Sequence, residues 1–209
     1  MDKIMSITIK NCFYEKLTFK KLYEAHIRAR KGKTFKAEII KFEINLENNL
    51  INLLNNIKNG TYNIGKYNVF YVNEPKEREI KALPYVDRIV HQWYIEESIK
   101  PYIVPRLITG TYACIDNRGT HAAVDKVQSD MKKINRNLNG DFWILKCDIK
   151  KFFNSINPNI LLNILSKFIT DKKLLSFTKL LIFSNATTNQ VGIPIRKLYI
   201  SIFCKYLLK

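Results

Sequence analysis

The run of residues 146–156, Lys-Cys-Asp-Ile-Lys-Lys-Phe-Phe-Asn-Ser-Ile, contains the residue types best suited to chemistry in this chain. Asp148 follows the apolar run 142–145, and the turn residues Asn139 and Gly140 precede that run, a pattern that predicts a buried strand. A carboxylate near the carboxyl end of a strand suits a Mg²⁺ ion that also holds substrate phosphates, because Mg²⁺ prefers oxygen ligands and keeps open positions. The alternative is that Asp148 only caps the turn that follows the strand.

Two helices are predicted at the amino-terminal end of the chain. Apolar positions at helical spacing predict one basic helix over residues 11–30 and a second helix from about Lys36 to the turn at Asn59 and Gly60. Alternating Tyr, Phe and Val residues then predict a β-hairpin with a basic tip, formed by strands over 67–72 and 78–83 and a turn over 74–77.

Three further stretches after the hairpin are predicted to be helical. Pro84 begins a helix that Pro101 ends, and its polar face carries Asp87, Arg88, His91 and Glu97. Thr120 caps the next helix, whose inward side is formed by Ala122, Ala123, Val127 and Met131. After Pro158, apolar spacing predicts one helix over 160–168 and another from about Asp171.

The charge of the chain indicates a polyanionic partner. Its 209 residues include 35 Lys and Arg against 18 Asp and Glu, which gives a formal net charge of +17. Basic residues interspersed with aromatic ones favour nucleic acid, because each neutralised phosphate releases counterions. The alternative is a lysine-rich solvated surface encoded by an AT-rich genome, which the many Asn, Ile and Lys residues also fit.

Other compositional features narrow the class of protein. Hydrophobic residues make up 46% of the chain, enough to form a core. No apolar run reaches the roughly eighteen residues of a membrane span, and the amino terminus lacks the apolar core of a signal peptide. We therefore expect a cytoplasmic protein without a membrane partner. The four cysteines are far apart in sequence, which indicates reduced thiols and neither a zinc site nor a disulfide framework.

Four sequence blocks resemble the reverse transcriptases of prokaryotic retroelements, and they occur in the same order. They are ALPYVDRIVH at 82–91, RGTHAAV at 118–124, DIKKFFNSI at 148–156 and GIPI at 192–195. Ile195 stands where many relatives carry Gln, so the chain is more similar to the diversity-generating retroelements than to group II introns or retrons. The similarity covers residues 61–195.

The resemblance implies an α+β fold, namely the fingers and part of the palm of a right-hand polymerase. It divides the chain into amino-terminal helices over 1–60, a fingers-like region over 61–140, a partial palm over 141–195 and a tail over 196–209. It also implies RNA-directed DNA synthesis, with RNA template, RNA–DNA hybrid and deoxynucleoside triphosphates as partners.

The family also implies roles for particular residues. Asp148 matches a catalytic carboxylate that binds Mg²⁺ in a two-metal mechanism, and the backbone carbonyl of Ile149 would reach the same metal. Phe153 matches the bulky residue that excludes a 2′-hydroxyl, and Lys76 and Arg78 match basic residues over the triphosphate.

Arg88, Gly119 and His121 fall in the blocks that contact the template strand in relatives. Each assignment has a simpler alternative. Phe152 and Phe153 could both be core aromatics, the hairpin charges could be solvated, and His121 could be a structural hydrogen-bonding residue.

The chain departs from the family after Ile195. Relatives continue with Gly-Asn-x-Thr-Ser-Gln and later supply a Tyr-x-Asp-Asp turn, whereas this sequence contains no Asp-Asp pair. One choice of codons for residues 196–209, read after dropping one base, encodes Gly-Asn-Phe-Thr-Ser-Gln, so we expect an out-of-frame tail on an amino-terminal fragment. This predicts an inactive chain. The alternatives are a non-catalytic RNA-binding module and a pseudogene product.

Overall fold

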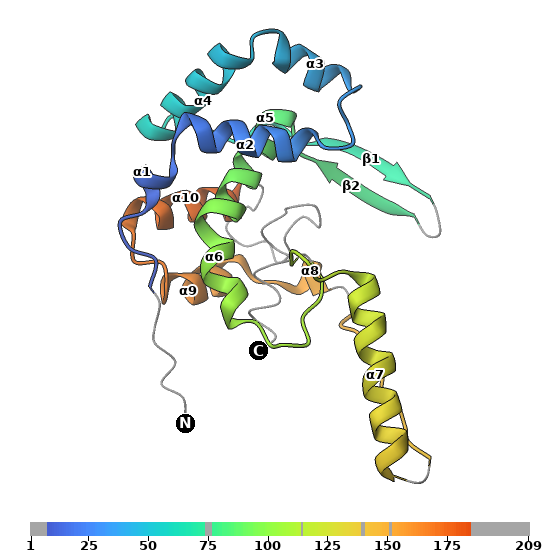
Figure 1. Ribbon diagram of the computed structural model, residues 1–209. Coiled ribbons are helices and arrows are strands. Elements are labelled where there is room, and N and C mark those ends of the chain that lie inside the picture. The colour runs from blue at the N-terminus through green and yellow to red at the C-terminus, as the bar shows by residue number, and fades with distance from the viewer. Residues whose placement is uncertain (1–7, 74–76, 114, 139–140, 151, 185–209) are drawn as a thin grey trace.

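The computed structural model describes residues 8–73, 77–113, 115–138, 141–150 and 152–184. Within these ranges the chain combines a helical body with a two-stranded antiparallel sheet, so the coarse α+β prediction is confirmed (Figure 1). None of the described helices is both long and apolar enough to cross a membrane.

The first predicted helix is two helices, α1 (Phe13–Lys16) and α2 (Phe19–Arg30). They separate at Thr18, which is extended and whose hydroxyl oxygen accepts a hydrogen bond from the Lys21 backbone N–H at 3.3 Å. Thr18 thereby satisfies an N–H group of the first turn of α2, and this local cap competes with a continuous helix.

The second predicted helix is also divided, into α3 (Ala37–Ile44) and α4 (Leu46–Asn59). The bend lies at Asn45, and across it the Asn49 side-chain amide donates to the Phe42 carbonyl at 2.8 Å. The predicted end of α4 is confirmed, because Gly60 adopts the left-handed conformation that terminates many helices.

The hairpin prediction is confirmed. Strand β1 (Asn68–Val72) pairs antiparallel with β2 (Arg78–Ala82), with Asn68 opposite Ala82 and Val72 opposite Arg78. Every residue of β1 is exposed, so neither face of this hairpin packs fully on the helical body. The hairpin projects from the body in Figure 1.

A nearly continuous helical rod forms the centre of the molecule. It runs through α5 (Tyr85–Trp93), a π-helical turn η1 (Tyr94–Ile99), α6 (Lys100–Ile103) and a 3₁₀ turn η2 (Val104–Arg106). The prediction that Pro101 ends this helix is wrong. Proline removes an N–H donor, and here a π-helical turn directly precedes the short helix that contains Pro101. The Glu97 carbonyl, which residue 101 of an α-helix would bind, instead accepts from Lys16 Nζ at 2.7 Å.

The core joins segments from both ends of the described chain. α2 packs most extensively on α5, and α10 (Lys172–Phe183) adds Phe177, whose ring lies 5.7 Å from Phe13 and 5.6 Å from Trp93. Offset and edge-to-face rings at such distances stabilise a core beyond their buried area. The helices predicted after Pro158 are confirmed as α9 (Pro158–Ser166) and α10.

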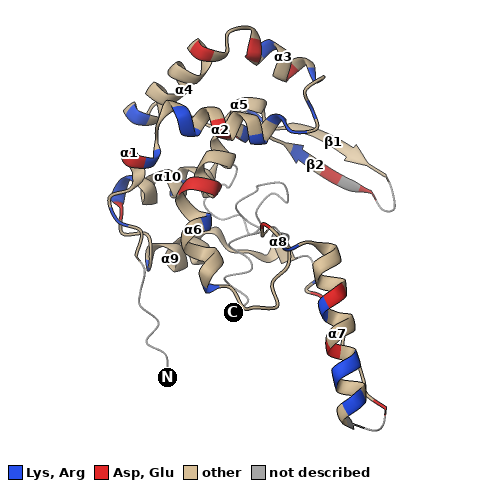
Figure 2. Ribbon diagram, in the orientation of Figure 1, with Lys and Arg blue, Asp and Glu red and all other residues tan. Residues whose placement is uncertain are grey.

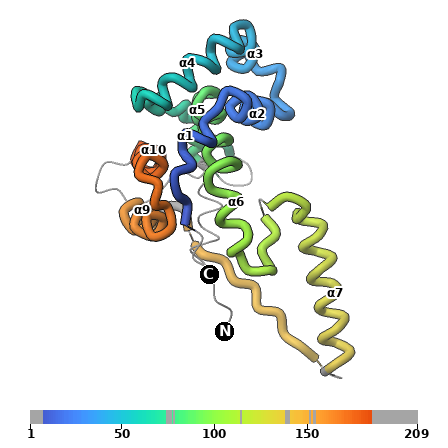
Figure 3. Tube along the Cα trace, turned by 60° about the vertical axis from the view of Figure 1, so that its left-hand side comes forward, coloured from blue at the N-terminus to red at the C-terminus, as the bar shows by residue number. Residues whose placement is uncertain are grey.

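A short backbone connection fixes the amino-terminal segment beside α9 and α10. Ile9 forms an isolated parallel bridge with Ile169, and its N–H donates to the Phe168 carbonyl at 2.8 Å. The Asp171 carboxylate caps α10 and also accepts from the backbone N–H of Phe13 at 2.9 Å. Figure 3 shows α1 beside α9 and α10.

The helix predicted from Thr120 is α7 (Thr120–Leu138), which extends away from the helical body in Figures 1 and 3. Its predicted apolar side is not buried within the described part of the chain. Of the four residues predicted to face inward, Val127 is 55% exposed, and Ala122, Ala123 and Met131 are only partly buried. The helix therefore forms from its local pattern, while its apolar side lacks the expected cover among the described residues.

Candidate nucleic-acid interface

The segment that carries Asp148 is extended but is not a strand of a sheet. Residues 141–149 pair with no strand among those described, and Trp143 and Leu145 are 98% and 87% exposed. The prediction of a buried strand here is therefore wrong for the described chain. A strand needs a neighbouring strand for its backbone hydrogen bonds, and apolar alternation alone does not supply one.

Asp148 itself is exposed, and Ile149 is 49% exposed. Among the described residues no group of three His, Cys, Asp or Glu side chains could hold a metal ion. A single exposed carboxylate with one backbone carbonyl does not form the donor set that two Mg²⁺ ions need. The described residues alone therefore do not form a two-metal centre.

The short helix α8 (Phe152–Ser155) follows Asp148 and contains Phe153. Its neighbour Phe152 is partly buried and packs against the core, which agrees with the alternative that one of the two rings is structural. The block at 192–195 and the tail at 196–209 lie outside the described residues.

Of the two predicted triphosphate contacts, only Arg78 lies in the described part of the hairpin. Arg78 is the first residue of β2, opposite Val72, whereas Lys76 lies outside the described residues. Glu79 and Lys81, two residues apart on β2, form an ion pair at 3.3 Å. Such an exposed pair contributes little to stability.

Arg88 lies on α5 and is engaged by other residues of the chain. Its guanidinium forms an ion pair with Glu38 and lies 5.3 Å from the centre of the Tyr85 ring. A template phosphate would have to compete with Glu38 for this guanidinium, because both anions use the same donors.

Gly119 and His121 lie at the amino-terminal end of α7. The Gly119 carbonyl accepts from the Ala123 N–H at 3.0 Å and so belongs to the first turn. A Cβ at Gly119 would meet no atom within 4 Å, and His121 is exposed. Both positions are therefore accessible to a ligand, and neither contacts Asp148 through any interaction that the structure records.

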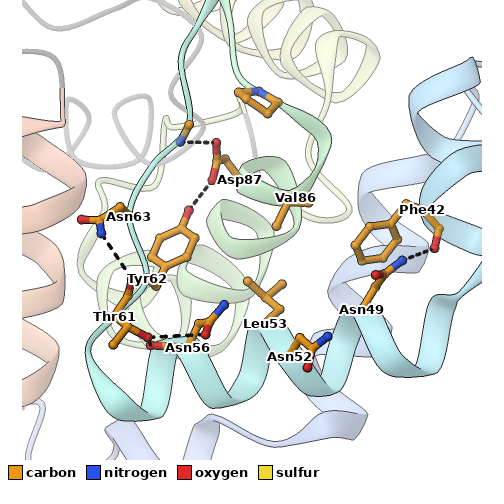
Figure 4. A pocket seen from close by; sticks show the side chains of 12 residues that line it. Phe42, Asn49, Asn52, Leu53, Asn56, Thr61, Tyr62, Asn63, Val86 and Asp87 are labelled. Carbon is orange, nitrogen blue, oxygen red and sulfur yellow. Dashed lines mark hydrogen bonds between the residues drawn. The ribbon is translucent and has the colours of Figure 1, made fainter.

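A pocket of about 520 Å³, lined by both polar and apolar side chains, lies between α4, residues 61–65 and α5 (Figure 4). Its charged member is Asp87, which is only 3% exposed. The Tyr62 hydroxyl donates to Oδ1 of Asp87 at 2.6 Å, and the Gly65 N–H donates to Oδ2 at 3.0 Å. Burial raises the pKa of Asp87, and the two hydrogen bonds oppose that rise by favouring the charged carboxylate.

The prediction of a polar solvent face on the helix after Pro84 is wrong at two positions. Asp87 and His91 are buried, whereas Arg88 and Glu97 are only partly exposed. Tyr62 and Gly65, the partners of Asp87, precede it by 25 and 22 residues, so no local pattern marks this carboxylate as internal. The partly exposed Glu97 carboxylate meets Lys21 at 2.9 Å and Arg28 at 3.3 Å.

Charged residues are distributed over most helices and the hairpin (Figure 2). The sequence matches no model of a known protein family, and no curated protein matches it.

Proposed function

We propose that this chain is part of a prokaryotic retroelement reverse transcriptase, an RNA-directed DNA polymerase, and that it supplies the fingers and part of the palm of a right-hand polymerase fold. The observation that carries the proposal is the order of four sequence blocks, at residues 82–91, 118–124, 148–156 and 192–195. A hairpin before the first block and a helix that begins within the second agree with this assignment.

The charge supports a nucleic-acid partner for this chain. A formal net charge of +17 attracts polyanions over a wide surface, and the exposed aromatic residues of β1, Phe70 and Tyr71, are of the type on which bases stack. The partners that we propose are an RNA template, an RNA–DNA hybrid and deoxynucleoside triphosphates.

The residue roles in this proposal follow the resemblance. Asp148 and the Ile149 carbonyl would contribute to a Mg²⁺ site, and Phe153 would select deoxynucleotides. Lys76 and Arg78 would contact the triphosphate, and the template would contact Arg88, Gly119 and His121. Because the sequence has no Asp-Asp pair, we propose that this chain has no polymerase activity by itself.

The first test is binding of RNA and of an RNA–DNA hybrid by the purified chain in a filter-binding titration. We expect binding with little sequence preference that weakens steeply with salt, with a log–log slope of about −0.7 to −0.9 per phosphate neutralised. An affinity that is independent of salt, or no binding at low salt, would contradict the nucleic-acid function.

The second test addresses catalysis. We expect no primer extension by this chain, and extension on an RNA template with Mg²⁺ after one base is removed behind the Ile195 codon. In that frame-restored protein, Asp148→Asn should reduce extension by more than the ~10²–10³-fold typical of losing one electrostatic contact, with RNA binding nearly unchanged. Full activity with Asn at position 148 would refute the assignment of Asp148.

A further inference from the structure

A row of basic and polar side chains follows one side of α7. Lys132, Lys133 and Arg136, here called the α7 basic stripe, line a shallow hollow of about 300 Å³ together with Asp125, Gln128 and Ser129. Spacings of three and four residues place these side chains on one side of the helix. In Figure 2 blue segments lie along the half of α7 that is farther from the body.

The three cations of the stripe are exposed, and they form no ion pair within the described part of the chain. One turn earlier, Lys126 does have a partner, because it pairs with Asp130 four residues later. The stripe is therefore a local concentration of positive charge that its own helix does not neutralise. A polyanion would neutralise it and release counterions.

The neighbours of the stripe suit phosphate as the ligand. The Gln128 amide and the Ser129 hydroxyl lie in the same hollow and are hydrogen-bond donors of the type that proteins use on phosphate oxygens. Arg136 adds a planar guanidinium that can bind two phosphate oxygens at once. Asp125 is the one carboxylate of the hollow, and it lies two turns from Lys132 and Lys133, away from the three cations.

The position of the stripe on the helix leaves it accessible. The exposed apolar residues Val124, Val127 and Ile134 lie on the opposite side of α7 by helical spacing. Whatever covers that apolar side would leave the stripe in solvent. Because α7 extends away from the helical body, a nucleic-acid strand could lie along the stripe without meeting the other described helices (Figure 1).

We propose that the α7 basic stripe binds the phosphate backbone of RNA. This inference rests on the proposed nucleic-acid function and assigns part of that binding to three residues outside the four sequence blocks. The contacts are to the backbone, so they set affinity and salt dependence and carry no sequence preference.

The test compares two variants of the whole chain that lose the same charge. One carries Lys132→Gln, Lys133→Gln and Arg136→Gln, and the other carries Lys31→Gln, Lys33→Gln and Lys36→Gln in the exposed connection between α2 and α3. Glutamine keeps helix propensity close to that of lysine and arginine. The probe is an unstructured poly(U) RNA titrated at several salt concentrations.

We expect the α7 variant to bind poly(U) roughly tenfold or more weakly at low salt and its log–log salt slope to decrease in magnitude by about two, since three single-strand contacts are lost. The α2–α3 variant should change the slope by less than about one. A further variant, Lys132→Arg with Lys133→Arg, should retain the parent affinity. Far-ultraviolet circular dichroism should show equal helicity in all variants.

Equal losses of poly(U) affinity in the two triple variants would overturn the proposal and show that binding depends on net charge alone. An unchanged affinity in the α7 variant would overturn it as well. These outcomes differ from failure of the proposed function, in which the parent chain itself would not bind poly(U) at low salt.

Discussion

Lys16 has a structural role that its charge alone does not reveal. Its Nζ donates to the Glu97 carbonyl at 2.7 Å and lies 5.2 Å from the centre of the Tyr102 ring. Lys16→Met would retain an apolar side chain of similar length but remove the hydrogen-bond donor. The partly buried Glu97 carbonyl would then lose its hydrogen bond from Lys16. We expect the free energy of unfolding to fall by about 1–2 kcal/mol, measured by chemical denaturation.

Lys20→Met is the matched control, because Lys20 is exposed and forms no hydrogen bond or ion pair that the structure records. Its effect should stay within about 0.5 kcal/mol of the parent chain. Equal effects of the two substitutions would show that the loss of a charge, and not the Glu97 contact, is what matters.

The end of helix α4 depends on Gly60. This residue has φ of 74° and ψ of 14°, and its N–H bonds to carbonyls of the last turn. The left-handed conformation is strained for any residue with a Cβ, although no atom lies within 4 Å of the position that a Cβ would take. Gly60→Ala should therefore lower the free energy of unfolding by about 1 kcal/mol in a denaturant titration.

Gly110→Ala is the control for the Gly60→Ala substitution. Gly110 also has open space around its Cβ position, but its φ lies outside the left-handed range. Alanine there should be neutral or stabilise by about 0.4–1 kcal/mol, because it restricts the unfolded chain. The prediction for Gly60 fails if both alanine variants have the same stability.

Asp171 connects distant parts of the chain. It caps α10 through the N–H groups of Lys173 and Leu174, and it accepts from the buried N–H of Phe13, 158 residues away. Asp171→Ala should remove the cap and also leave the Phe13 N–H unpaired. We expect a loss of about 2–4 kcal/mol in the free energy of unfolding, the sum of both effects.

Asn157→Ala separates these two effects. Asn157 caps α9 through Asn159 and Ile160, and both hydrogen bonds are exposed and local. Its replacement should cost only about 1 kcal/mol, the usual value of a helix cap. If the two cap variants are equally stable, the bond to Phe13 contributes nothing measurable to the fold.

Features that depend on neighbours in sequence could be predicted from the sequence. Alternating residues and turn residues predicted the hairpin, Gly60 predicted the end of α4, and apolar spacing predicted α7, α9 and α10. These features form locally because their capping groups, turn conformations and amphipathic patterns lie within a few residues of one another. Most candidate site residues came from the four sequence blocks, and Lys76 and Arg78 came from the predicted hairpin. Nothing in the spacing of these residues could show which of them lie together.

The positive charge and most of the individual helices and strands follow from the sequence alone. Three features depend instead on the folded arrangement: Asp87 and His91 are buried, the central helical rod continues through Pro101, and residues 141–149 pair with no described strand. Each of these features depends on residues far away in the chain. Such residues bury Asp87 and His91, donate the hydrogen bond that Lys16 gives to the Glu97 carbonyl, and provide or fail to provide a partner strand. Local pattern predicts which segments can form an element, whereas contacts between distant segments decide which of those elements are completed.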